Sequence, residues 1–258
     1  MKIGVFDSGL GGLIITKALI GALPEYDFAY LGDTANLPYG TRSGEVIRSV
    51  SERAINWLFE TQDCALAIIA CNTASIAALK YLQKKYPARK ILGVIIPTAE
   101  EVARRGFKRV GVIATQATIQ SRVYEQELAK LDPAIEVMSR ATPLLVPLIE
   151  NGGDKYAPEV INDYLSGFEG IEALILGCTH YPHYKDLIAM RLPRAEIISQ
   201  DEIIPESLTL YLARHGEIAE RLSRGGIRRF FITDMTPSYA SQAERMFGGE
   251  IPVEKVAI

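Results

Sequence analysis

Cysteine is scarce in this chain, with only three among 258 residues. That number excludes the disulfide framework of a small secreted protein and favours a reducing, cytoplasmic environment. Long hydrophobic runs are also missing, since no stretch approaches the roughly 20 apolar residues that a membrane-spanning helix needs. The opening residues MKIGVFDSG have the pattern of a strand and a turn, so we expect no signal peptide.

An excess of charge of one sign is equally absent. The net charge is −3 at pH 7 and the isoelectric point is near 5.8. These values exclude a broad basic surface for nucleic acid or for an anionic membrane, and we expect neither partner. Hydrophobic residues make up 48% of the chain, which is enough for a substantial core. The length favours two domains.

Short apolar segments alternate with segments of helical spacing along the whole chain. ALAIIA at 65–70 is apolar at every position, which is typical of a strand covered by helices on both faces. The alternation predicts an α/β fold with parallel sheets. The expected strands are 2–6, 27–31, 65–70, 91–95, 109–113, 135–138, 172–176, 195–198, 228–232 and 252–256, and the expected helices include 45–60, 73–85, 118–130, 201–222 and 238–247.

A weak internal repeat indicates two related halves. KIGVF at 2–6 aligns with RVGVI at 109–113, and the same offset of 107 superposes Cys71 on Cys178. Each cysteine follows an apolar strand, at the carboxyl edge where open α/β sheets bind ligands. The repeat therefore predicts two thiols that face each other across one cleft.

The residues after these strands, Cys71-Asn72-Thr73 and Cys178-Thr179-His180, carry chemistry that a core strand does not need. Two thiols on opposite faces of a carbon can remove a proton from one side and return one on the other, which inverts a stereocentre. We expect the helix after each cysteine to lower the thiol pKa toward neutrality. We expect Asn72, Thr73 and Thr179 to donate hydrogen bonds to a carboxylate. A free cysteine taken alone is more often a packing residue, and that is our assignment for Cys64.

The glycine-rich FDSGLGG at 6–12 is predicted to be a strand, a turn and the start of a helix. It is not a dinucleotide fingerprint, because Ile14 stands at the third glycine position, and no Gly-Lys-Ser/Thr follows that would make a phosphate-binding loop. We expect its glycines to allow a close backbone approach or a positive φ. Three roles stay open for Asp7: a helix cap, an acid–base helper beside a thiol, or a ligand of a substrate ammonium group.

Two further patterns give weaker predictions. LGDTANLPYG at 31–40 is a loop whose tyrosine can line a pocket. Cys178, His180 and His183 are crowded within six residues, which does not match a zinc-site spacing, so we expect no metal.

Taken together, these motifs resemble the bacterial glutamate racemases, in the cofactor-independent aspartate/glutamate racemase family. FDSGLGGL, YLGDTANLPYG, ACNTAS, GVIATQATIQS, PLLVPLIE and GCTHYP occur in that family's order over almost the full length. The resemblance implies two flavodoxin-like domains related by pseudo-symmetry, with the active site between them. The implied limits are 1–96 with 208–258 for the first domain and 97–207 for the second. It also implies a racemisation without a cofactor, in the cytoplasm, that supplies D-glutamate for peptidoglycan. It leaves open whether the protein forms a homodimer.

The resemblance also implies roles for individual residues. Cys71 would take the proton from the D-enantiomer and Cys178 from the L-enantiomer, while Asp7 and His180 assist their respective thiols. Glu150 would be a further acidic group in the cleft. The substrate would contact Asp7, Ser8, Tyr39, Gly40, Asn72, Thr73, Thr179 and His180. Ile96 and Thr98 depart from the family pattern, in which an acid and a glycine are frequent, and they leave the domain junction or assembly uncertain.

Three alternatives remain beside this interpretation. A racemase of the same superfamily acting on aspartate or another amino acid is the nearest. A hydrolase using Cys178 and His180 is the second, although residues two apart in a loop rarely reach thiol–imidazole geometry, and it leaves Cys71 unexplained. A non-enzymatic anion-binding module is the third, and it gives neither thiol a task.

Overall fold

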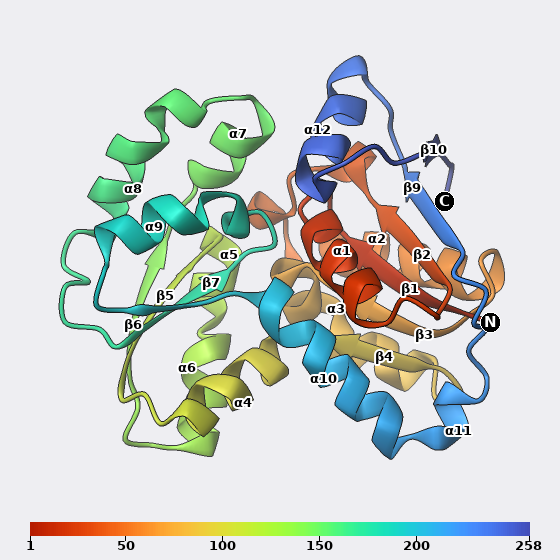
Figure 1. Ribbon diagram of the computed structural model, residues 1–258, viewed down its shortest axis with the longest axis horizontal. Coiled ribbons are helices and arrows are strands. Elements are labelled where there is room, and N and C mark those ends of the chain that lie inside the picture. Colours follow the sequence, from red (N-terminus) through yellow and green to blue (C-terminus); the bar gives the residue numbers. More distant parts are fainter.

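Ten strands form two separate sheets, each with all of its strands parallel (Figure 1). The computed structural model describes all 258 residues. The first sheet has the order β10-β9-β2-β1-β3-β4 and the second has the order β6-β5-β7-β8. The bounds are β1 Lys2–Asp7, β2 Phe28–Gly32, β3 Cys64–Ile69, β4 Lys90–Gly93, β5 Arg109–Ala114, β6 Glu136–Ala141, β7 Ala173–Gly177, β8 Glu196–Ile198, β9 Arg228–Ile232 and β10 Val253–Lys255. Every predicted strand is confirmed, within one or two residues at most ends.

The two halves repeat one topology, which confirms the predicted fold class. The order β2-β1-β3-β4 in the first sheet corresponds to β6-β5-β7-β8 in the second. Strands β1 and β5 begin at Lys2 and Arg109, which are 109 − 2 = 107 residues apart. Because the strands are parallel and equivalent, Cys71 and Cys178 follow the carboxyl ends of equivalent strands, β3 and β7.

Helices connect successive strands and cover the sheets (Figure 1). Two expected helices are interrupted. The predicted helix 118–130 is broken at Arg122, whose φ of 54° is left-handed and ends α5, and the predicted helix 201–222 is broken at His215, just before Gly216. The bounds are α1 Gly12–Ala22, α2 Gly44–Glu60, α3 Asn72–Lys85, α4 Ile95–Arg105, α5 Gln116–Ser121, α6 Val123–Leu131, α7 Leu145–Glu150, α8 Ala157–Leu165, α9 Lys185–Arg191, α10 Gln200–Arg214, α11 Gly216–Ala219 and α12 Pro237–Phe247.

The chain passes between the two halves twice. It leaves the first sheet after β4 through α4, and it leaves the second after β8 through α10, which packs against both α1 and α4. Strands β9 and β10 then extend the first sheet on its β2 edge. The domain limits 1–96 with 208–258 and 97–207 stay a prediction. Each strand lies in the sheet that these limits give it, and helix α10 continues through residue 208 without a break.

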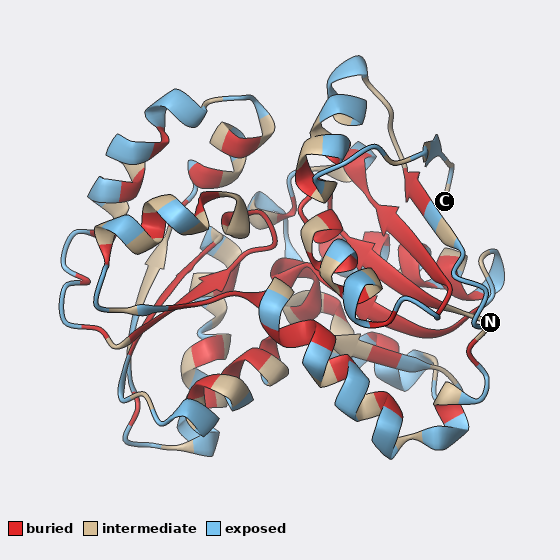
Figure 2. Cartoon of the chain, in the orientation of Figure 1, coloured by how far each residue is buried: buried red, intermediate tan, exposed pale blue.

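The core lies on both faces of each sheet (Figure 2). All six residues of β3 are buried, which is the pattern expected for a strand covered twice. Cys64 lies in this core with Ala67 and Ile69, as its assignment to packing predicted. Burying a large aliphatic side chain contributes about 1.5–3 kcal/mol, so the sheets provide a rigid base for the loops at their carboxyl ends. None of the helices is both long and apolar enough to cross a membrane.

Candidate active site

A cavity of about 290 Å³ lies where the carboxyl ends of the two sheets meet, and both cysteines line it. It draws on segments of both halves, as the repeat predicted. The predicted site residues among its lining are Ser8, Tyr39, Gly40, Cys71, Asn72, Thr73, Glu150, Cys178, Thr179 and His180. Asp7 is the exception: it is fully buried and does not line the cavity.

Cys71 is the residue that caps the N-terminus of α3. Its Sγ accepts a hydrogen bond from the backbone N–H of Ala74 at 3.4 Å. We expected the helix to lower the thiol pKa, and for Cys71 this is wrong. Burial, followed by the nearby charge of Asp7, raises the pKa of Cys71 to about 12, against the hydrogen bonds from Ser8 and Ala74. Desolvation outweighs the helix terminus, so burial favours the protonated form of Cys71 in the free protein at neutral pH.

Cys178 has a different environment, built around His180. Its Sγ lies 3.8 Å from Nδ1 of His180, and Nε2 of the same ring lies 3.0 Å from a carboxylate oxygen of Glu150. Burial alone would lower the pKa of His180, but its hydrogen bonds with Cys178 and Glu150 raise it well above the usual value. A protonated imidazole stabilises a thiolate. Residues two apart in a loop rarely reach thiol–imidazole contact, and Cys178 and His180 are a case in which they do.

Asp7 lies beneath the cavity and connects the two halves. One carboxylate oxygen accepts a hydrogen bond from the hydroxyl of Thr179 at 3.3 Å, and the other accepts one from the N–H of Gly9 at 3.1 Å. Burial raises the pKa of Asp7, and the charge of His180 opposes that rise. This position fits a group that exchanges protons with a thiol, since it is close enough to influence the pKa of Cys71.

Four backbone N–H groups beside the cysteines make no hydrogen bond within the protein. They belong to Asn72 and Thr73 at the start of α3, and to Thr179 and His180 after β7. The two pairs are related by the offset of 107, since 179 − 72 and 180 − 73 both equal 107. Unpaired N–H groups at a helix N-terminus bind anions well. The cavity therefore has donors for a carboxylate on both of its sides.

The side chain of Asn72 is engaged elsewhere. Its amide nitrogen donates to Gln200 at 2.9 Å, and its oxygen accepts from the hydroxyl of Tyr124 at 2.8 Å. This hydrogen bond uses one of the two N–H groups of the amide, so donation to a carboxylate by the other N–H stays a prediction. The backbone N–H of Asn72 is a further donor for a ligand. Thr73 lines the cavity, and its hydroxyl lies 3.0 Å from that of Thr115. Its donation to a carboxylate stays a prediction.

The loop after β2 brings Tyr39 and Gly40 to the cavity. The hydroxyl of Tyr39 donates to the buried carboxylate of Asp33 at 2.6 Å. Asp33 also accepts hydrogen bonds from Asn36, at 2.9 and 3.0 Å, and from Thr233 at 2.7 Å. Several charge-assisted hydrogen bonds to one buried carboxylate fix the loop, so Tyr39 lines the cavity in a defined position.

The glycines of the FDSGLGG segment allow close packing beneath the site. A Cβ added to Gly11 would lie 2.5 Å from Nδ1 of His180 and 2.6 Å from the hydroxyl oxygen of Thr179. A Cβ added to Gly12 would likewise lie 2.4 Å from the Cβ of Asp7. The φ of Gly11 is −59°, so close approach, one of the two expected reasons, applies there and a positive φ does not.

Several lining residues were missed by sequence analysis. Thr115 could have been found, because it follows β5 as Ser8 follows β1, and 115 − 8 = 107. Thr142 follows the edge strand β6, and its hydroxyl lies 2.6 Å from that of Tyr181. Tyr239 comes from α12 in the C-terminal tail, and no local pattern placed that helix near the cavity.

The crowded histidines do not converge on one point. His183 lies 3.1 Å from a carboxylate oxygen of Asp154, whereas His180 faces Cys178 and Glu150. No group of three or more His, Cys, Asp or Glu side chains is arranged to hold a metal ion.

Comparison with known proteins agrees with the fold described above. The family described as Asp/Glu/Hydantoin racemase matches residues 13–202. The glutamate racemase of Geobacter metallireducens is 38% identical, over 96% of this chain and 93% of that protein. The structure of the Francisella tularensis glutamate racemase in complex with D-glutamate has a TM-score of 0.91 and 36% identity, covering 99% of this chain and 97% of that one. A glutamate racemase isoform from Bacillus anthracis has a TM-score of 0.91 and 35% identity, covering 100% and 97%.

Proposed function

The chain belongs to the Asp/Glu/hydantoin racemase family, and we propose that it is a glutamate racemase in which Cys71 and Cys178 transfer the α-proton without a cofactor. As a member of this family it is a racemase, and so an isomerase. The observation that carries the proposal is that two thiols from equivalent strands of two related halves line one cavity. A hydrolase or an anion-binding module has a use for one of these thiols at most.

The two thiols differ in the way that the reaction requires. In the direction from L- to D-glutamate, Cys178 acts as the thiolate base, because the protonated His180 stabilises its negative charge. Cys71, which burial keeps protonated, delivers a proton to the opposite face of the α-carbon. The completed reaction leaves Cys71 as the thiolate, ready for the reverse direction. Asp7 on one side and His180 with Glu150 on the other return the protons through exchange with water.

The substrate's α-carboxylate would bind the free backbone N–H groups beside the cysteines. Removing the α-proton places negative charge on the α-carbon and its carboxylate, so donors that are already oriented stabilise the transition state more than the ground state. Asn72 and Thr73 supply two such groups from one half, and Thr179 and His180 supply two from the other. Ser8, Tyr39 and Gly40 line the same cavity and remain candidates for the rest of the substrate.

Racemisation in deuterated water tests the two-base mechanism. When different thiols remove and deliver the proton, the delivered hydrogen comes from solvent. Deuterium should therefore appear in the product enantiomer at early times and hardly at all in recovered substrate. A single base that returns the original proton would leave the product unlabelled, and that result would refute the mechanism.

The absence of a cofactor is tested separately. Purified protein should racemise glutamate after dialysis against a chelator and without added pyridoxal phosphate, as followed by circular dichroism of D-glutamate. Activity that depends on either addition would contradict the proposal. Comparable turnover of aspartate in the same assay would favour the aspartate racemase alternative.

We further propose that the protein works in the cytoplasm and supplies D-glutamate for peptidoglycan. The three cysteines are unpaired, which suits a reducing compartment, and two of them must stay reduced to transfer protons. Loss of the gene product should make a bacterial host dependent on added D-glutamate. Growth without that supplement would contradict the proposed role.

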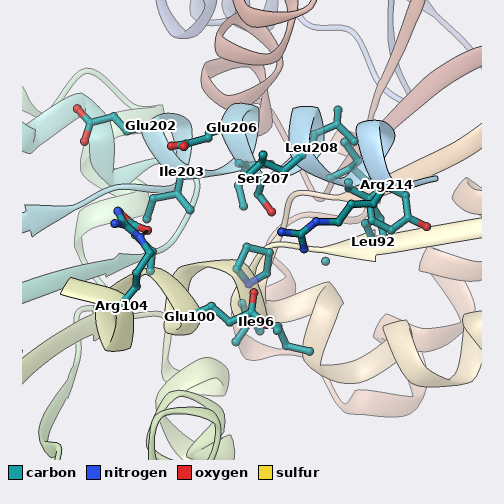
Figure 3. Close-up of a pocket in the computed structure, with 18 of the residues that line it drawn as sticks. Leu92, Ile96, Glu100, Arg104, Glu202, Ile203, Glu206, Ser207, Leu208 and Arg214 are labelled. Atoms are coloured by element: carbon teal, nitrogen blue, oxygen red, sulfur yellow. Dashed lines mark hydrogen bonds and ion pairs between the residues drawn. The ribbon is translucent and has the colours of Figure 1, made fainter. Parts of the chain in front are cut away.

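A homodimer is the assembly that we propose, through a groove between α4 and α10 (Figure 3). The groove has a volume of about 680 Å³ and shares no residue with the catalytic cavity. Ile96 and Leu210 lie along it, each 48% exposed. Arg214 and Glu206, both on α10, make no ion pair within the chain, so each is free to meet the opposite charge of the partner subunit in a two-fold arrangement. Ile96 is also where the family pattern has an acid, and an apolar residue there favours an interface.

Sedimentation analysis decides this assembly. The parent protein should sediment as a dimer, and Ile96→Glu should shift it to a monomer because the substitution buries a charge in the interface. Leu131→Glu is the matched control, since Leu131 is 47% exposed on α6 and lies outside the groove. A parent protein that is monomeric, or dimers that survive Ile96→Glu, would rule the groove out as the interface.

A further inference from the structure

A cluster of four buried polar side chains lies where the two halves are joined. Asn72, Thr98, Tyr124 and Gln200 are each at most 2% exposed. Asn72 belongs to α3 of the first half and Tyr124 to α6 of the second. Thr98 lies on α4 and Gln200 on α10, the two helices through which the chain crosses between the halves. The cluster therefore touches both halves and both connections between them.

The hydrogen bonds of this cluster form a closed set. The side-chain amides of Asn72 and Gln200 pair reciprocally, with N···O distances of 2.9 and 3.0 Å. Tyr124 donates its hydroxyl proton to Asn72 at 2.8 Å and accepts a hydrogen bond from Gln200 at 3.0 Å. Buried networks with every member satisfied are rigid, and the loss of one member leaves the others unpaired.

Thr98 connects the network to the first crossing. Its hydroxyl donates to the carbonyl of Val94 at 2.7 Å and lies 3.5 Å from the amide nitrogen of Gln200.

We propose that Gln200 is a positioning residue for Cys71: together with Tyr124 and Thr98 it holds Asn72, and so fixes the first turn of α3 against both crossings. Cys71 is the N-cap of that helix, and the free N–H groups of Asn72 and Thr73 are its first two. A shift of this turn moves the thiol and two carboxylate donors together, whereas Cys178 lies on another loop. The expected effect on racemisation rests on the proposed function, whereas the expected shift of Cys71 does not.

Two near-isosteric variants test the proposal. Gln200→Met keeps the side-chain length and removes every hydrogen bond of the amide. Tyr124→Phe removes a single hydroxyl and leaves the amide pair, so it serves if Gln200→Met fails to fold. Tyr184→Phe is the matched control, because Tyr184 is also buried and its hydroxyl donates to Asp154 at 2.9 Å, away from the network.

The first measurement is the racemisation kinetics of folded protein. Both network variants should lower kcat/KM by about tenfold or more, the scale of a catalytic group moved by a fraction of an ångström. The substrate isotope effect should rise with α-deuterated D-glutamate, whose proton goes to Cys71, more than with the L-enantiomer. Tyr184→Phe should lose stability without either change. Equal kcat/KM in the network variants and the control would reduce the cluster to a structural role and overturn the proposal.

The second measurement does not need racemisation. Iodoacetamide labels both thiols, and peptide mapping gives the ratio of the labelling rates of Cys71 and Cys178. That ratio should change several-fold in Gln200→Met and stay constant in Tyr184→Phe. A parent protein that fails to racemise glutamate would end the proposed function, and the labelling ratio would still decide whether Gln200 positions Cys71. An unchanged ratio would refute that positioning.

Discussion

Gly11 offers the sharpest test of how the first half supports the catalytic residues of the second. Its φ of −59° and ψ of −34° are ordinary helical values, so an alanine is acceptable to the backbone. The space is not, because the new Cβ would lie 2.5 Å from Nδ1 of His180 and 2.6 Å from the hydroxyl oxygen of Thr179. Any loss in Gly11→Ala therefore arises from contact with these two side chains.

The size of the effect follows from the overlap. Ordinary van der Waals contact begins near 3.4 Å, so His180 must retreat by 3.4 − 2.5 = 0.9 Å. A misplacement of about 1 Å at a catalytic group costs on the order of a hundredfold in rate, or about 2.7 kcal/mol in the barrier. His180 already lies 3.8 Å from Sγ of Cys178, and a further retreat removes that contact. We expect kcat/KM of Gly11→Ala to fall by about a hundredfold.

The assay is racemisation of D- and L-glutamate followed by circular dichroism, with thermal unfolding of the same samples. The equilibrium constant between enantiomers is unity, so kcat/KM should fall equally in both directions. Gly21→Ala is the matched control on the same helix, because nothing lies within 4 Å of its added Cβ. It should keep full activity and gain about 0.5–1 kcal/mol of stability from the better helix former. A folded Gly11→Ala protein with near-parental kcat/KM would refute the argument that close packing at Gly11 holds His180.

Two further predictions concern the site, and a third concerns the buried core residue Cys64. Cys71→Ala and Cys178→Ala should each lower the racemisation rate by several powers of ten, each power being about 1.4 kcal/mol in the barrier. Cys64→Ala should leave the rate unchanged. A near-normal rate in Cys71→Ala would exclude Cys71 as a base. Thr73→Ala should raise the barrier by about 1–3 kcal/mol through loss of a charged hydrogen bond to the substrate, and Thr179→Ala should raise it through loss of the hydrogen bond to Asp7. Both effects are measured by kcat/KM, and unchanged values would show that neither hydroxyl takes part in the reaction. Burial raises the pKa of Cys64 to about 12, whereas the thiol of the unfolded chain has a pKa of about 8.5. Above a pH of about 8.5 the unfolded chain therefore loses a proton that the folded protein keeps, so the free energy of unfolding falls as the pH rises. Between pH 8 and pH 10, the free energy of unfolding measured in urea should fall by about 2 kcal/mol less in Cys64→Ala than in the parent. Equal falls in both proteins would mean that burial does not keep the Cys64 thiol protonated.

The amino-acid sequence by itself determined the strands, their parallel arrangement and the place of the two thiols. Apolar runs such as 65–70 and the offset of 107 are local patterns, or comparisons of local patterns, and each half repeats them. Parallel strands bring their carboxyl ends to one edge, so Cys71 and Cys178 could be placed on one cavity before any coordinates were known. Thr115 obeys the same offset and was predictable in principle.

Only the tertiary structure decided the environment of these residues. The pKa of Cys71 rises because desolvation depends on everything packed around the thiol, whereas its sequence neighbours indicate only a helix terminus. Asn72 is held by a reciprocal pair of amide hydrogen bonds with Gln200, which is 128 residues away in the sequence. Asp7 lies beneath the cavity because Gly12 leaves room for it, and Tyr239 arrives on a helix from the tail. Burial and long-range hydrogen bonds arise between segments that are distant in sequence, and no local pattern encodes them.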